Sequence, residues 1–121
     1  MKKVLVVDDS NTIRQQAGFI IEKAGYETEF AQNGQEGLNK LSANIGFVLL
    51  DVNMPVMSGL EMLKELRAIP EYAELPVFIL TTESSSELIN QAKELKASGW
   101  MMKPFEPNDL VNVIRKYDLS S

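Results

Sequence analysis

The chain has 121 residues and a net charge of −5, with 45% hydrophobic and 24% charged residues. These values are typical of one globular domain, which we expect to span residues 1–121. The chain contains no cysteine and no histidine, which excludes disulfide bonds and thiolate metal sites and removes the most common general base.

The acidic balance argues against direct binding to nucleic acid or to an anionic membrane. No apolar run approaches the ~18 residues of a membrane span, and the N-terminal segment MKKVLVV carries no cleavable signal pattern. We therefore expect a cytoplasmic protein with no membrane partner.

Short apolar runs alternate with stretches of helical periodicity along the chain. Near-continuous apolar runs predict strands that are covered on both faces, and a segment of alternating character predicts an edge strand. Apolar residues at helical spacing predict helices between these strands. In chain order we predict strand 4–7, helix 13–24, edge strand 26–30, helix 34–41, strand 47–50, helix 59–66, strand 77–80, helix 88–95, strand 100–102 and helix 110–117.

Five strand-then-helix units predict an α/β fold. Such alternation gives parallel strands joined by right-handed crossovers, with helices on both faces of one sheet. We therefore expect a doubly wound, five-stranded parallel sheet.

Polar residues follow four of the predicted strands. Asp8 and Asp9 follow the first, Asp51 the third, Thr81 the fourth and Lys103 the fifth. In an open parallel sheet, ligands bind outside the carboxyl ends of the strands. The fold therefore predicts that these five side chains share one site.

Three carboxylates in one site repel one another unless a cation lies between them. Mg²⁺ prefers carboxylate, water and phosphate oxygens, so we interpret Asp8, Asp9 and Asp51 as a magnesium site. Taken alone, Asp8 and Asp9 have a second interpretation as residues that cap a helix. Phosphoryl transfer would also use Lys103 and Thr81. Lys103 can neutralise one phosphate oxygen and the hydroxyl of Thr81 can donate a hydrogen bond to another, while Asp51 reacts as the nucleophile.

Four motifs resemble a known family. The segments VLVVDDS, LLDVNMPVMSGLE, FILTTE and WMMKPF resemble the receiver domain of two-component response regulators, in particular the stand-alone, CheY-like receivers of the chemotaxis type. The likeness runs over essentially the whole chain. It implies a flavodoxin-like sheet with strand order 2-1-3-4-5.

The resemblance also implies a role for each motif residue. Asp51 matches the phosphoacceptor, Asp9 a direct Mg²⁺ ligand, and Asp8 a ligand that acts through water. Asn53 matches the residue whose backbone carbonyl completes the metal site. The remaining matches are Thr81 with the switch hydroxyl, Lys103 with the phosphate-contacting lysine, Lys103–Pro104 with a peptide that is usually cis, and Trp100 with the switch aromatic residue.

The function implied is a signalling switch that catalyses only its own phosphorylation and dephosphorylation. The expected partners are a CheA-like histidine kinase and a downstream protein such as a flagellar motor switch component. Only residues 118–121 follow the last predicted helix, which suits a free-standing regulator. A receiver excised from a larger protein would have the same sequence features.

Three other classes of protein are alternative interpretations of the sequence. An aspartate-nucleophile phosphatase of the haloacid dehalogenase type also uses Mg²⁺, but its nucleophile usually lies in an Asp-x-Asp motif on the first strand. A flavodoxin-like cofactor binder would have a Ser/Thr/Gly-rich phosphate loop, whereas this chain presents carboxylates. A pseudo-receiver that binds partners without phosphorylation would not need the complete residue set.

Overall fold

A computed structural model describes residues 2–82 and 85–119 of the chain. Five strands and five α-helices alternate in this part, and one 3-10 helix, η1, follows the third α-helix. The strands are β1 (Lys3–Val7), β2 (Thr28–Ala31), β3 (Ile45–Asp51), β4 (Val77–Thr81) and β5 (Gly99–Met102). The helices are α1 (Asn11–Lys23), α2 (Gly34–Lys40), α3 (Gly59–Ala68), η1 (Pro70–Tyr72), α4 (Ser86–Glu94) and α5 (Pro107–Arg115).

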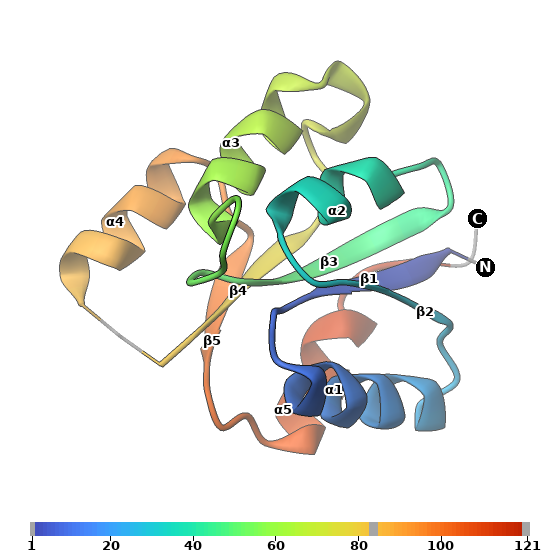
Figure 1. Ribbon diagram of the computed structural model, residues 1–121. Helices are drawn as coiled ribbons and strands as arrows, with labels where there is room; N and C mark the ends of the chain where they lie inside the picture. Colours follow the sequence, from blue (N-terminus) through green and yellow to red (C-terminus); the bar gives the residue numbers. More distant parts are fainter. Residues whose placement is uncertain (1, 83–84, 120–121) are drawn as a thin grey trace.

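All five strands are parallel and form one sheet in the order β2-β1-β3-β4-β5. This confirms the predicted doubly wound α/β fold and the strand order that the resemblance implies. β2 lies at an edge of the sheet, as its alternating pattern predicted. Helices α1 and α5 cover one face, and α2, α3 and α4 cover the other (Figure 1).

Side chains of successive strand residues enter two separate hydrophobic cores. Leu5 and Val7 of β1 pack toward α3 and α4, whereas Val4 and Val6 pack toward α1 and α5. This follows from the two-residue period of a strand. Every residue of β3 is buried, because this strand lies in the middle of the sheet with helices on both sides.

Some boundaries differ from the sequence prediction. The edge strand begins at Thr28 rather than at residue 26. The last helix begins at Pro107, before its first buried residue Leu110, because proline is favoured in the first turn of a helix. Gly25, which directly follows the first predicted helix, has a positive φ of 100°, which glycine adopts without the steric cost of a Cβ.

No helix among the described residues is both long enough and apolar enough to cross a lipid bilayer. Because all strands are parallel, their carboxyl ends lie along one edge of the sheet, and the predicted site residues lie at this edge.

Candidate functional site

The turn after β1 holds the two adjacent acids in different environments. Asp8 is fully buried, whereas Asp9 is exposed. The backbone N–H of Ser10 donates to Asp8 Oδ1 (2.9 Å), and Arg14 Nη1 donates to the backbone carbonyl of Asp8 (2.6 Å). Ser10 also caps α1, so the helix start and the acidic turn are one structural unit.

Asp51 is the last residue of β3, and only 6% of its surface is exposed. The chain after it turns back on itself, because the N–H of Gly59 donates to the carbonyl of Val52 (2.9 Å). A Cβ atom at Gly59 would lie only 2.1 Å from the carbonyl oxygen of Asp51. This position therefore requires glycine, and α3 begins directly against the backbone of Asp51.

Lys103 lies just after β5 and reaches back across the edge of the sheet. Its Nζ lies 2.8 Å from Asp8 Oδ2 and 3.0 Å from Asp51 Oδ1. Its backbone N–H donates to the carbonyl of Thr81 (2.8 Å), which ties the end of β5 to the end of β4. The Lys103–Pro104 peptide is cis, as the resemblance implies.

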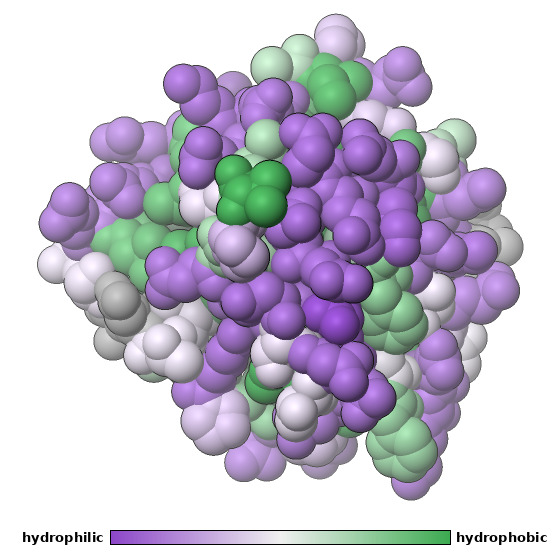
Figure 2. All heavy atoms as spheres, in the orientation of Figure 1, coloured by the Kyte–Doolittle hydropathy of each residue, from purple (hydrophilic) through white to green (hydrophobic). Residues whose placement is uncertain are grey.

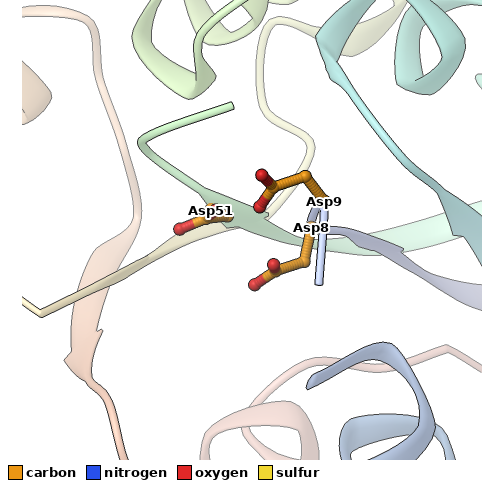
Figure 3. Close-up of side chains that lie close together, drawn as sticks. All are labelled: Asp8, Asp9 and Asp51. Carbon is orange, nitrogen blue, oxygen red and sulfur yellow. The ribbon is translucent and has the colours of Figure 1, made fainter. Parts of the chain in front are cut away.

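Asp8, Asp9 and Asp51 form a compact cluster. One carboxylate oxygen from each lies within 4.8 Å of the others, and the three side chains face the same space beyond the ends of β1 and β3 (Figure 3). The three carboxylates outnumber the ammonium of Lys103 and the guanidinium of Arg14, which contacts the backbone of Asp8, and so leave an excess of negative charge there. Only oxygen donors are present in the cluster, which fits a hard divalent cation.

Two groups at the site, Asp51 and Lys103, have shifted pKa values. Burial raises the pKa of Asp51, and the charges of Asp8 and Asp9 raise it further, while the hydrogen bond from Lys103 opposes the change. Burial alone would lower the pKa of Lys103, but its hydrogen bonds to Asp8 and Asp51 outweigh burial and raise that pKa. The site therefore holds Lys103 charged and makes the ionised form of Asp51 costly until another cation binds.

Thr81 and Asn53 lie close to Asp51 along the sheet and the chain. Thr81 ends β4 and is 2% exposed, and the residue before it, Leu80, pairs with Asp51. Asn53 is exposed and follows Asp51 by two residues. Both therefore flank the carboxylate cluster at the same edge of the sheet.

Trp100 lies outside the cluster of Asp8, Asp9 and Asp51. It pairs with Ile79 within the sheet, but its side chain is 43% exposed, and Lys93 Nζ of α4 lies 5.9 Å from its ring centroid. The indole ring is thus on the α4–β5 surface and not in the acidic cluster, in a contact with the geometry of a cation–π interaction.

Sequence reasoning missed Arg14 as a residue of the site. It lies one turn into the helix that follows Asp8 and Asp9, but its contact is with a backbone carbonyl, which no sequence motif specifies. An arginine four residues after the N-cap Ser10 is the only signal in the sequence that could have indicated it.

Residues 4–115 match the family described as the response regulator receiver domain. The chain belongs to this family. Receiver domains are signalling switches of two-component systems, so the chain is a two-component signalling protein.

Individual relatives agree with this assignment. The receiver is 37% identical to chemotaxis protein CheY1 of Helicobacter pylori, over 89% of this chain and 90% of that protein. The crystal structure of chemotaxis protein CheY4 of Vibrio cholerae matches with a TM-score of 0.91 and 43% identity, over 96% of this chain and 98% of that one. A transcriptional regulatory protein, the CpxR homolog of Haemophilus influenzae, is 36% identical over 95% of this chain but only 49% of its own length.

Proposed function

We propose that the whole chain, residues 1–121, is one receiver that accepts a phosphoryl group on Asp51 from the phosphohistidine of a histidine kinase. The observation that supports this most is the contact of Lys103 Nζ with Asp8 and Asp51 inside a cluster of three carboxylates. A carboxylate is a competent nucleophile for phosphoryl transfer. Most of the catalysis then comes from positioning and charge neutralisation.

Mg²⁺ is the proposed cofactor. Asp8, Asp9, Asp51 and the backbone carbonyl of Asn53 would hold it, with Asp8 acting through water. The cluster offers oxygen donors with an excess of negative charge, which this cation prefers. When bound, Mg²⁺ supplies positive charge for the phosphoryl oxygens.

The proposed transfer has one bond-forming and one bond-breaking event. An oxygen of the Asp51 carboxylate forms the new bond to phosphorus, the phosphorus–nitrogen bond to the donor imidazole breaks, and the electron pair leaves with that nitrogen. Lys103 provides a point charge for one phosphoryl oxygen, and the hydroxyl of Thr81 provides a hydrogen bond for another.

The phosphorylated state would change a surface some distance from Asp51. A phosphoryl group adds charge and strong acceptor oxygens, which would attract Lys103 and Thr81. Because Lys103 and Thr81 are joined at the ends of β5 and β4, their movement would repack Trp100 and alter the surface formed by α4, β5 and α5. A protein partner that prefers one arrangement would read the switch.

Chemotaxis is the pathway we propose, with a CheA-like kinase and a flagellar motor switch component as partners in the cytoplasm, and with no nucleic-acid or membrane partner. The support is that two relatives are named chemotaxis proteins and match over nearly their whole length. The transcriptional CpxR homolog, which this chain spans over about half its length, supports a second candidate, in which the receiver serves a longer regulator.

The fluorescence of Trp100 tests the proposal, because it is the only tryptophan in the chain. Acetyl phosphate with Mg²⁺ is expected to change the emission of the wild-type protein and to leave Asp51→Asn unchanged. An equal response from both proteins would contradict the assignment of Asp51. Mg²⁺ without acetyl phosphate is the control for metal binding alone.

A further inference from the structure

Val56 combines two features that cost free energy in the isolated molecule. Its backbone φ is 69°, and the N–H of Met57 donates to the carbonyl of Pro55 across it (2.7 Å). Val56 is thus the central residue of a γ-turn of the positive-φ type, a rare and strained conformation, and a positive φ is a genuine outlier for a β-branched residue. Its side chain is also 81% exposed, the largest exposed fraction among the large hydrophobic residues of the described chain. Neither feature is repaid by burial of the valine side chain.

The loop around Val56 is well anchored, so its conformation is imposed by its neighbours. Met54 and Met57 pack against the core on the α3 side. The carbonyl of Met57 accepts from the backbone N–H of Gly34 in α2 (3.2 Å), which ties the loop to a second element. Figure 2 shows a strongly hydrophobic spot among hydrophilic side chains in the region where this loop lies in Figure 1.

The loop that carries Val56 starts at the proposed phosphoacceptor and returns to it. It leaves β3 at Asp51 and closes where Gly59 bonds to Val52. Val56 is the fifth residue after Asp51, so the two lie within roughly 17 Å of each other even for a fully extended chain. Val56 is therefore part of the surface that surrounds the phosphoacceptor.

A protein that delivers a phosphoryl group to Asp51 must cover this surface. A standard protein interface buries about 800 Å² per partner, which is a patch of roughly 16 Å radius. A donor centred on Asp51 reaches the loop tip, whereas a small donor such as acetyl phosphate does not. Burial of an apolar side chain is favourable in such an interface and would offset the cost that Val56 imposes in the free protein.

We propose that Val56 is a docking residue for the phosphodonor protein, which buries it in an apolar recess beside its phosphohistidine. This inference rests on the proposed function. It concerns affinity for the protein donor and assigns Val56 no part in the chemical step.

Two substitutions separate the side chain from the backbone. Val56→Asn removes the apolar surface and puts a polar side chain of similar size in its place. Val56→Leu keeps an apolar surface at the same position and is the matched control. Both are expected to fold, because the side chain of residue 56 is 81% exposed and is part of neither hydrophobic core.

The experiment measures phosphorylation from two donors. One is an autophosphorylated chemotaxis-type histidine kinase that phosphorylates the wild type, and the other is acetyl phosphate. We expect Val56→Asn to lower the second-order rate constant for transfer from the kinase roughly fivefold to tenfold. Val56→Leu is expected to stay within about twofold of the wild type. Both variants are expected to react with acetyl phosphate at the wild-type rate.

Three results would overturn the inference while leaving the proposed function intact. They are wild-type transfer from the kinase to Val56→Asn, an equal loss in Val56→Leu and Val56→Asn, and an equal loss with kinase and acetyl phosphate. If the wild type accepts no phosphoryl group from either donor, the proposed function fails, and the inference fails with it.

Discussion

Lys103 lies between two buried carboxylates, and only 15% of its side chain is exposed. A buried charge that loses its partner is costly, because it stays desolvated without the compensating attraction. Lys103 is also the proposed contact for the phosphoryl group, so its removal should affect stability and phosphorylation in separable ways.

We predict that Lys103→Met lowers the free energy of unfolding by about 2 kcal/mol in EDTA, because Asp8 and Asp51 then lack their shared cation. Mg²⁺ should restore part of this loss, since it compensates the same carboxylates. Urea unfolding with and without Mg²⁺ measures both effects. The matched control is Lys3→Met, which removes a half-exposed pair with Glu29 (3.8 Å) and should cost less than about 0.5 kcal/mol. Equal losses in the two variants would contradict the interpretation.

At the residue scale, the sequence was sufficient to predict the acidic cluster and its lysine. Asp8, Asp51 and Lys103 each follow an apolar run, and parallel strands bring such residues together whatever the details of packing. The positive φ of Val56 and the contact of Arg14 with a backbone carbonyl could not be predicted. Both depend on the exact path of a loop or turn, which the residue types do not specify.

At the scale of elements, the junction between β3 and α3 sets the position of Asp51. The start of α3 is fixed by a capping box between Ser58 and Glu61 and by the close approach of Gly59 to the Asp51 carbonyl. Any side chain at residue 59 must therefore push α3 away from the strand that carries Asp51.

We predict that Gly59→Ala destabilises the protein by about 2–3 kcal/mol, because backbone atoms cannot make room for the new methyl group as a flexible side chain can. The matched control is Gly37→Ala in α2, where the nearest atoms are the flexible end of Met62 at 2.8 Å and 2.9 Å. Alanine also favours a helix by about 1 kcal/mol over glycine, so Gly37→Ala should cost much less. Thermal unfolding of both variants checks this, and similar Tm values would show that the junction is softer than the structure indicates.

The types of the elements and their order along the chain could be predicted from hydrophobic patterns. Buried strands show continuous apolar runs, and helices show apolar residues at helical spacing. The short helix η1 (Pro70–Tyr72) was not predicted, since three residues are too few to show periodicity. The strand order 2-1-3-4-5 came from the family resemblance alone. Periodicity shows that strands alternate with helices, but it does not show which strands are neighbours in the sheet.

At the scale of the whole molecule, the acidic cluster joins the ends of β1 and β3 with Lys103 beyond β5, so a cation bound there would stabilise the sheet as a unit. A ligand that binds only the folded state raises its stability by mass action. The stability of this receiver should therefore depend on Mg²⁺.

We predict that Mg²⁺ at about ten times its dissociation constant stabilises the wild type by about 1.4 kcal/mol, which corresponds to a rise of roughly 3–6 °C in Tm for a domain of this size. Asp9→Asn should lose most of this rise, because it removes an exposed carboxylate that we propose as a ligand, without breaking a buried contact. Calorimetry in Mg²⁺ and in EDTA at matched ionic strength measures the shift. Equal shifts in the wild type and Asp9→Asn would place the cation elsewhere.

The most direct test of the central claim is the intact mass of the protein after treatment with a small phosphodonor, followed by fragmentation to locate the modification. We predict a gain of one phosphoryl group on Asp51 that requires Mg²⁺ and is absent from Asp51→Asn. No gain in the presence of Mg²⁺, or a gain carried by another residue, would contradict the account.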